Sequence, residues 1–196
     1  MNSTNIETVA EHSVNLELLP EQSNILDLGC RGFEFERHFS SLGHFVCCVD
    51  ADPQIKDVPN DANFFRMAIS NEEGECAIQN TVDPQARHII KGIGTKKMTI
   101  ESFTETLNKN NIGKIAWDLI KIDIEGEEFN ILKSSKHPIA KQVSVEFHAH
   151  CRIEQTKQSI EELLKELEQY YTVHNAVWET RHSAGYNFWD VLLIAK

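Results

Sequence analysis

The sequence carries little positive charge. Its 196 residues include 19 lysines and arginines against 30 aspartates and glutamates, which gives a formal net charge of -11. Proteins hold nucleic acids mainly with cationic side chains that neutralise phosphates. The charge balance therefore argues against a nucleic-acid partner, and among macromolecular substrates it favours a basic protein.

The sequence also lacks a membrane-spanning run and a cysteine framework. No apolar segment approaches the roughly 20 residues that cross a bilayer, and the polar first residues form no basic-then-apolar leader. The 5 cysteines are odd in number and form no C-x-x-C pair. This is typical of reduced, buried cysteine rather than of disulfides or a zinc site. We expect a cytoplasmic protein with no membrane attachment.

The chain length fits one domain with a substantial core. Residues 1–22 are polar with sparse apolar positions, so we expect an N-terminal extension there, with a short helix between Ile6 and Leu19. Residues 23–196 are expected to form the single domain.

The most informative stretch covers residues 117–132, W-D-L-I-K-I-D-I-E-G-E-E-F-N-I-L. Its apolar, mostly β-branched positions predict a strand that is buried on both faces. Lys121, Asp123 and Glu125 alternate and should project from one side. Gly126 permits a tight turn into an apolar helix. Ligands of open α/β sheets bind at the carboxyl ends of strands, so Asp123 and Glu125 predict a ligand-binding site there. The alternative is an ordinary strand–turn–helix connection whose charges are solvated.

Residues 24–50 follow the order strand, glycine-rich turn, helix, strand, acid. The strands are expected over 24–29 and 45–49, the helix over 33–42, and the turn reads D-L-G-C-R-G. Glycines let a backbone approach a ligand, and an acid about twenty residues further on can accept hydrogen bonds from ribose hydroxyls. The unit predicts a nucleotide site with Asp50 on the ribose, and a turn or cap role for Asp50 is the alternative.

The rest of the chain continues the alternation of strands and helices. Strands are expected over 63–70, 75–81, 142–147, 172–178 and 187–195, helices over 99–111 and 153–171, and a flexible loop over 82–97. Thr99 is a candidate N-cap. The link between the last two strands is too short for a crossover helix, so that pair should be antiparallel.

Residues 119–133, L-I-K-I-D-I-E-G-E-E-F-N-I-L-K, resemble the most distinctive segment of the FkbM-like methyltransferases. A-I-S-N-E-E-G at 68–74, T-I-E-S-F at 99–103 and V-E-F-H at 145–148 also match, and the resemblance extends over residues 24–196. It implies an α/β fold of the Rossmann-like, class I methyltransferase type. The sheet would be mostly parallel and seven-stranded, with a C-terminal antiparallel hairpin.

The same resemblance implies S-adenosyl-L-methionine as methyl donor and transfer to an oxygen of a small hydroxylated acceptor, such as a sugar. By position, the donor would contact Asp27, Gly29, Gly32, Asp50, Met67 and Ala68. The first three would line its methionine end, the fourth its ribose and the last two its adenine. Asp123 would face the reacting centre.

One position departs from the family pattern. The family's first turn usually has a glycine six residues after its acid, where this chain has Phe33 and places its glycine one residue earlier. A non-catalytic donor-binding or interaction domain is therefore the second hypothesis. A nucleotide-dependent oxidoreductase is the third, and the terminal hairpin and the shortened turn disfavour it.

Two mechanisms fit the polar residues at the strand ends, where the candidate catalytic residues are Asp123, Glu125, Glu146 and His148. In the first, a hard divalent cation such as Mg²⁺ binds Asp123 and Glu146, with Glu125 as an optional third ligand, and activates an acceptor hydroxyl. In the second, His148 or Asp123 is a metal-free general base. The alternatives are that Glu146 pairs with Lys121 and that the neighbouring His150 is an exposed loop residue.

Overall fold

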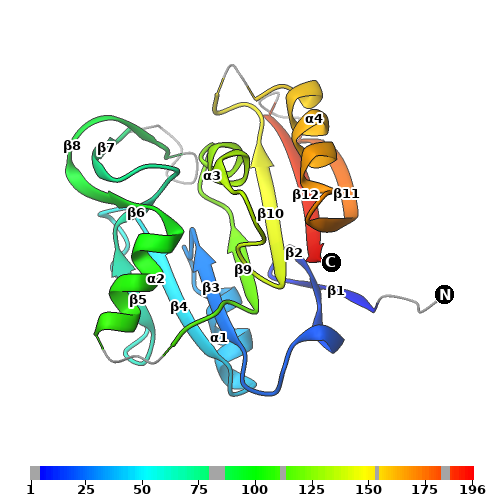
Figure 1. The fold of residues 1–196 in the computed structure, drawn as a ribbon. Coiled ribbons are helices and arrows are strands. Elements are labelled where there is room, and N and C mark those ends of the chain that lie inside the picture. The colour runs from blue at the N-terminus through cyan, green and yellow to red at the C-terminus, as the bar shows by residue number, and fades with distance from the viewer. Residues whose placement is uncertain (1–4, 80–86, 111–113, 153–154, 182–185) are drawn as a thin grey trace.

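A seven-stranded sheet forms the centre of the computed structural model, which describes residues 5–79, 87–110, 114–152, 155–181 and 186–196 (Figure 1). Across the sheet the strands are β11 (Tyr171–Arg181), β12 (Tyr186–Ala195), β10 (Gln142–His148), β9 (Leu119–Ile122), β3 (Asn24–Leu28), β4 (Phe45–Asp50) and β5 (Asn63–Arg66). The last five run parallel, whereas β12 is antiparallel to both of its neighbours. The predicted mostly parallel sheet with a terminal antiparallel hairpin is confirmed.

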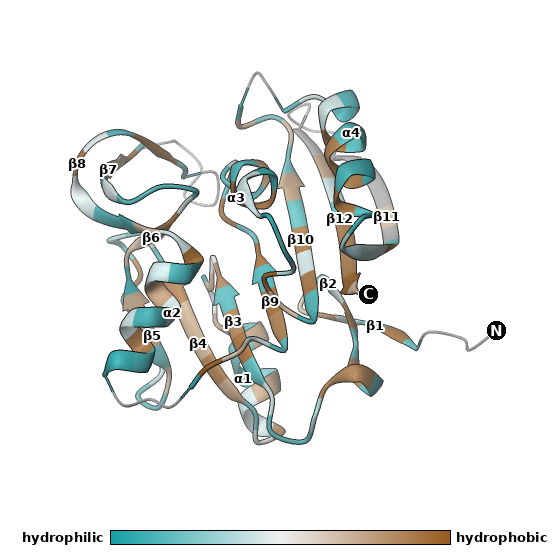
Figure 2. Cartoon of the chain, in the orientation of Figure 1, coloured by the Kyte–Doolittle hydropathy of each residue, from teal (hydrophilic) through white to brown (hydrophobic). Residues whose placement is uncertain are grey.

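Helices cover both faces of this sheet (Figure 1). They are α1 (Glu34–Ser41), α2 (Ile100–Lys109), α3 (Glu128–Ser134) and α4 (Lys157–Leu167). Side chains of α2, α3 and α4 share one core with Leu26, Cys47 and Ile120, whereas α1 shares another with Ile25 and Leu119. Adjacent strand residues thus enter opposite cores, as the alternation of side chains along a strand requires. Figure 2 shows the hydrophobic strands at the centre of the sheet.

Side-chain caps set where two of the helices begin. Thr99 accepts a hydrogen bond from the backbone N–H of Ser102, which confirms it as the N-cap of α2. The helix predicted over 153–171 is too long at both ends, because a capping box of Thr156 and Ser159 starts α4 at residue 157. Tyr171 belongs to β11, where its buried hydroxyl accepts a hydrogen bond from the backbone of a neighbouring segment.

The helix predicted between Ile6 and Leu19 is wrong. The segment forms a hairpin of β1 (Ile6–Val9) and β2 (His12–Asn15), followed by a short 3-10 turn, η1 (Leu16–Leu18). Ala10 and Glu11 both have positive φ angles, 45° and 70°, which close a tight two-residue hairpin turn. Neither residue is a glycine or asparagine, so the sequence carried no signal for this turn.

The N-terminal hairpin docks on the main sheet through a side-chain amide. Gln142 donates to the carbonyl of Asn15 at 2.9 Å and accepts from its backbone N–H at 3.0 Å. Both residues are buried, and paired hydrogen bonds between buried groups fix relative position. The hairpin is thereby held across the sheet, with His12 buried beneath the strand ends.

A smaller three-stranded sheet replaces most of the predicted flexible loop. Its strands are β6 (Ala68–Ile69), β8 (Ile89–Met98) and β7 (Gly74–Ile78), with β8 in the middle. The loop expectation is wrong for residues 89–97, and residues 82–86 lie outside the described residues. Gly92 lies within this segment, and a Cβ built there would lie 2.6 Å from the Cβ of Ala77, so the glycine allows the close approach of β8 to β7. The strand predicted over 63–70 is divided between the two sheets.

Among the described residues, no helix is long and apolar enough to cross a membrane. All five cysteines are free, and four of them are buried, as the sequence predicted.

Gly29→Ala should destabilise the fold far more than Gly43→Ala. Both glycines have left-handed φ angles, 78° and 85°, but an added Cβ at Gly29 would lie 1.7 Å from the carbonyl oxygen of Asp123, whereas Gly43 has open space. We expect a loss of about 1 kcal/mol in unfolding free energy for Gly43→Ala and at least about 3 kcal/mol for Gly29→Ala. Urea denaturation measures both, and equal losses would contradict the close approach.

Candidate active site

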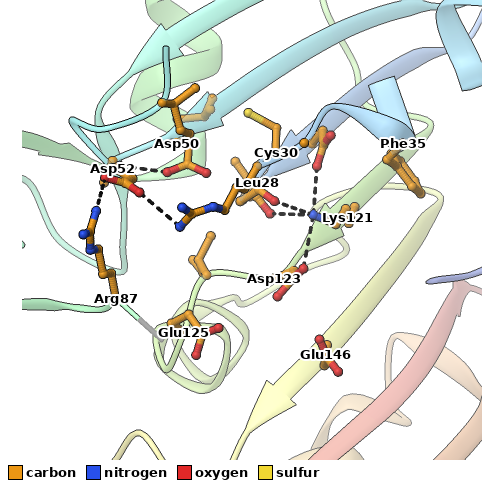
Figure 3. Close-up of a pocket in the computed structure, with 18 of the residues that line it drawn as sticks. Leu28, Cys30, Phe35, Asp50, Asp52, Arg87, Lys121, Asp123, Glu125 and Glu146 are labelled. Atoms are coloured by element: carbon orange, nitrogen blue, oxygen red, sulfur yellow. Dashed lines mark hydrogen bonds and ion pairs between the residues drawn. The ribbon is translucent and has the colours of Figure 1, made fainter. Parts of the chain in front are cut away.

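A cavity of about 1020 Å³ opens at the carboxyl ends of β3, β4, β9 and β10 (Figure 3). All ten residues that the sequence analysis selected line it: Asp27, Gly29, Gly32, Asp50, Met67, Ala68, Asp123, Glu125, Glu146 and His148. They come from strands that are distant in sequence but end at the same sheet edge, where ligands of open α/β folds bind. The tertiary structure thus brings the predicted donor and catalytic residues to one cavity.

The glycine turn has a left-handed backbone at three positions. Gly29, Gly32 and Phe33 all have positive φ angles, at 78°, 85° and 58°. Phe33 is buried and packs edge-on against Phe64, with ring centroids 5.7 Å apart. Hydrophobic burial therefore holds a phenylalanine in a conformation that glycine adopts more readily. Phe33 is the N-cap residue of α1, so the turn still leads directly into that helix.

A buried lysine joins the ends of β3 and β9. The ammonium nitrogen Nζ of Lys121 lies 3.1 Å from Oδ1 of Asp27 and 3.4 Å from Oδ2 of Asp123, and it donates to the carbonyl oxygen of Gly29 at 2.6 Å. Burial by itself would lower the pKa of Lys121, but the two carboxylates outweigh burial and raise it. Lys121 is therefore the cation that compensates the wholly buried Asp27.

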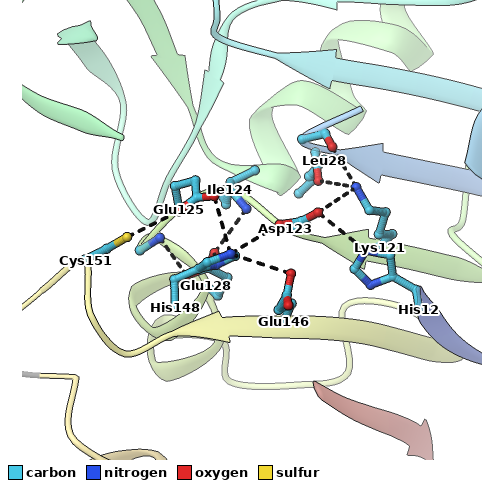
Figure 4. A network of polar contacts seen from close by, with 12 residues as sticks. His12, Leu28, Lys121, Asp123, Ile124, Glu125, Glu128, Glu146, His148 and Cys151 are labelled. Atoms are coloured by element: carbon cyan, nitrogen blue, oxygen red, sulfur yellow. Dashed lines mark hydrogen bonds and ion pairs between the residues drawn. The ribbon is translucent and has the colours of Figure 1, made fainter. Parts of the chain in front are cut away.

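Asp123 is held between cationic and imidazole groups. Its Oδ2 faces Lys121 and lies 3.4 Å from Nε2 of His12, while its Oδ1 lies 3.5 Å from Nε2 of His148 (Figure 4). Burial acts to raise the pKa of Asp123, but Lys121 first, and the two histidines with it, hold that pKa well below its usual range. Asp123 is consequently a carboxylate at neutral pH. Sequence reasoning missed His12, because nothing marks a single histidine in a polar N-terminal segment.

His148 lies at the centre of four carboxylates, a group that we call the His148 cluster: Asp123, Glu125, Glu128 and Glu146 (Figure 4). Its Nδ1 donates to Oε1 of Glu128 at 2.7 Å. Burial acts to lower the pKa of His148, but Glu128, with further contributions from Glu125 and Asp123, raises that pKa to about 10. In the protein alone, the imidazole is therefore protonated at neutral pH.

Glu125 and Glu128 play different parts in this cluster. Glu128 is fully buried and accepts hydrogen bonds from the backbone N–H groups of Ile124 at 3.1 Å and Gly126 at 2.9 Å. Glu125 adopts a positive φ of 54° and accepts from the thiol of Cys151 at 3.3 Å. Burial, with the charges of Glu128 and Asp123, raises the pKa of Glu125 to about 7. A strained, uncommon backbone at such a position is a typical feature of functional sites.

The opposite end of the cavity is built around Asp50 and Asp52 (Figure 3). Oδ1 of Asp50 accepts from the backbone N–H of Asp52 at 2.8 Å, so Asp50 does have the turn role weighed for it, while its side chain also lines the cavity. Burial raises the pKa of Asp50 to about 6, and Asp52 adds to the rise. Asp52 in turn pairs with Arg87 at 2.8 Å and Arg31 at 3.2 Å. Sequence reasoning missed both arginines, which are distant from Asp52 in the chain.

Met67 and Ala68 lie beside Asp50, at the junction of β5 and β6. The backbone N–H of Met67 donates to the carbonyl of Asp50 at 3.2 Å, which extends the pairing of β4 with β5 by one residue. Ala68 is buried and Met67 packs against the main core. This wall of the cavity is apolar, in contrast to the charged wall around His148.

The fold and the cavity define a Rossmann-like methyltransferase domain of class I. The family model described as the methyltransferase FkbM domain matches residues 10–188, and the chain belongs to this family of S-adenosylmethionine-dependent methyltransferases. The match includes His12 in the N-terminal hairpin. A comparison with curated proteins gave no match.

Three solved structures are among those to which this chain is similar. A TehB-like SAM-dependent methyltransferase from Corynebacterium glutamicum is 15% identical with a TM-score of 0.44, and the alignment covers 92% of this chain and 84% of that one. A dimethyladenosine transferase from Plasmodium falciparum is 13% identical with a TM-score of 0.49, covering 91% and 57%. A SAM-dependent methyltransferase from Methanosarcina mazei is 11% identical with a TM-score of 0.42, covering 91% and 95%.

Lys121→Met should destabilise the protein strongly, because it leaves Asp27 buried without its cation. We expect a loss of about 3–5 kcal/mol in unfolding free energy. Lys141→Met is the matched control, since Lys141 pairs with Asp118 at 2.7 Å but is 63% exposed, and it should cost less than about 1 kcal/mol. Chemical denaturation at pH 7 measures both variants. Similar small losses would show that the buried pair does not stabilise the fold.

Proposed function

We propose that the protein transfers a methyl group from S-adenosylmethionine to an oxygen of a small hydroxylated acceptor. The observation that carries the proposal is that one cavity contains both the glycine turn with Asp50 and the carboxylates around His148. A volume of about 1020 Å³ is at the upper end of small-molecule sites, which suits a donor and an acceptor bound together.

The residues at one end of the cavity fit the donor. The left-handed turn at Gly29 and Gly32 exposes backbone to the cavity, Asp50 offers a carboxylate to ribose hydroxyls, and Met67 with Ala68 offers an apolar wall to a base. When bound, S-adenosylmethionine supplies a methyl group on a positively charged sulfonium sulfur. The carboxylates that line the cavity complement such a charge.

The residues at the other end fit a hydroxyl group. Asp123, Glu125 and Glu146 are acceptors that can orient a hydroxyl by its proton. Glu125, whose pKa burial raises to about 7, is the group suited to take that proton at neutral pH. Asp123 has the firmest position, because Lys121 and His12 hold its second oxygen. A small acceptor is favoured over a nucleic acid by the net charge of -11.

Donor affinity should fall in acid. Asp50, whose pKa is about 6, can accept two ribose hydrogen bonds only when it is ionised, so binding should weaken about tenfold between pH 7 and pH 5. Calorimetry with S-adenosylmethionine measures this. Asp50→Asn should bind weakly at both pH values and lose the dependence, whereas Asp61→Asn, which changes an exposed acid outside the cavity, should behave as wild type. A pH dependence that persists in Asp50→Asn would remove Asp50 from the donor site.

Asp123→Asn should abolish methyl transfer while the protein still folds. The amide keeps the shape of the side chain but lacks the charge that faces Lys121, His12 and His148. Methylated product from a panel of sugars and related hydroxylated metabolites, followed by mass spectrometry, is the measurement, with circular dichroism to verify folding. Donor binding without turnover of any acceptor, in the wild type, would favour the non-catalytic donor-binding alternative.

A further inference from the structure

The imidazole of His148 is aimed at a point between three carboxylates. Its Nε2 lies 3.5 Å from Oδ1 of Asp123, 3.5 Å from Oε1 of Glu125 and 3.6 Å from Oε2 of Glu146. N–H···O hydrogen bonds in proteins span about 2.7–3.2 Å, so none of these three contacts is a hydrogen bond. The side chain of His148 is 2% exposed, and solvent therefore gives Nε2 little compensation.

These distances match the spacing of ligands around a metal ion. Bonds of about 2.0–2.2 Å from an ion to imidazole nitrogen and carboxylate oxygen place tetrahedral ligand atoms about 3.4 Å apart. The ligand atoms of Asp123, Glu146 and His148 all lie within 4.8 Å of one another. The three ligand atoms are thus close enough to share one ion, and Oε1 of Glu125 lies beside them, 3.5 Å from the same Nε2.

The surroundings of His148 are those of a metal-ligating histidine. Such histidines usually donate their second ring N–H to a carboxylate, which fixes the ring and its tautomer. Nδ1 of His148 donates to Glu128 at 2.7 Å, and Glu128 is held by two backbone N–H groups. Nε2 is thereby the nitrogen presented to the carboxylates, as Figure 4 shows. Glu128 is a positioning residue, because it acts through His148 (Figure 4).

The ligand set selects the class of ion. Mg²⁺ prefers an octahedron of oxygen atoms and keeps several waters, whereas imidazole suits zinc, copper, iron and nickel, and carboxylate oxygens also suit manganese. We propose that Asp123, Glu146 and His148 form a site for a divalent transition-metal ion of the Zn²⁺ or Mn²⁺ type, with Glu125 at its edge. This replaces the two-carboxylate Mg²⁺ site that the sequence suggested.

The ion would serve the proposed methyl transfer. A divalent cation at this point would lower the pKa of an acceptor hydroxyl bound to it and so produce a better oxygen nucleophile. That role rests on the proposed function, but metal binding itself does not, because the site uses neither Asp50 nor the glycine turn.

Calorimetry on chelator-treated full-length protein tests the site, with Zn²⁺, Mn²⁺ and Mg²⁺ as separate titrants. We expect one ion per chain, with Zn²⁺ or Mn²⁺ bound at least tenfold more tightly than Mg²⁺. Glu146→Gln should weaken binding at least tenfold, and Glu128→Gln should weaken it about tenfold to a hundredfold through the orientation of His148. Glu162→Gln changes an exposed acid on α4 and should leave the affinity unchanged.

Several results would overturn the proposal. One is the absence of stoichiometric binding; another is a Glu146→Gln variant that binds as well as wild type. A third is loss of binding in Cys151→Ser, since Glu125, His150 and Cys151 form a neighbouring group of possible ligands. Titration with Co²⁺ separates the two groups, because only coordination by Cys151 would produce a thiolate charge-transfer band. Donor binding by the same wild-type protein is measured separately, so failure of the metal site and failure of the proposed function are distinguishable.

Discussion

The contact between Lys121 and the two aspartates, Asp27 and Asp123, is the interaction on which the site depends. It places one buried cation between the wholly buried Asp27 and the partly exposed Asp123, at the ends of neighbouring strands. A buried charge without a partner is costly, so β3 and β9 are held in the register that brings these groups together. The same register brings Gly29 against the backbone of Asp123. The glycine turn and Asp123 are therefore linked through one buried lysine.

An excess of negative charge shapes the other half of the cavity. Four carboxylates surround His148. Burial first, and then this crowding, raises the pKa of Glu125, and the same carboxylates raise the pKa of His148 against the effect of burial. A cluster of this kind favours any cation that can enter it: a proton, a sulfonium group or a metal ion. Both proposals follow from this property. The proposed methyl transfer uses it to favour the sulfonium group of the donor, and the proposed metal site uses it to bind a divalent ion at Asp123, Glu146 and His148.

Much of the fold could be predicted because its signals are local. Apolar β-branched runs identified the seven strands of the main sheet, Thr99 identified the start of α2, and the short final link identified the antiparallel hairpin. The errors came where partners distant in sequence decide the structure. β8 has few apolar residues and is a strand because β6 and β7 supply its hydrogen bonds. β1 and β2 are held by the amide of Gln142, which no pattern in residues 6–19 could reveal.

The sequence by itself determined the strands of the main sheet and the helices between them, the family, and ten of the residues that line the cavity, because each depends on residue types at short spacing. The tertiary structure alone decided which groups face one another. It placed His12 beside Asp123, two arginines beside Asp52, and the Nε2 atom of His148 between three carboxylates. These contacts depend on strand register and on hairpin docking. Both are set by long-range packing and buried hydrogen bonds, which leave no periodic trace in the chain.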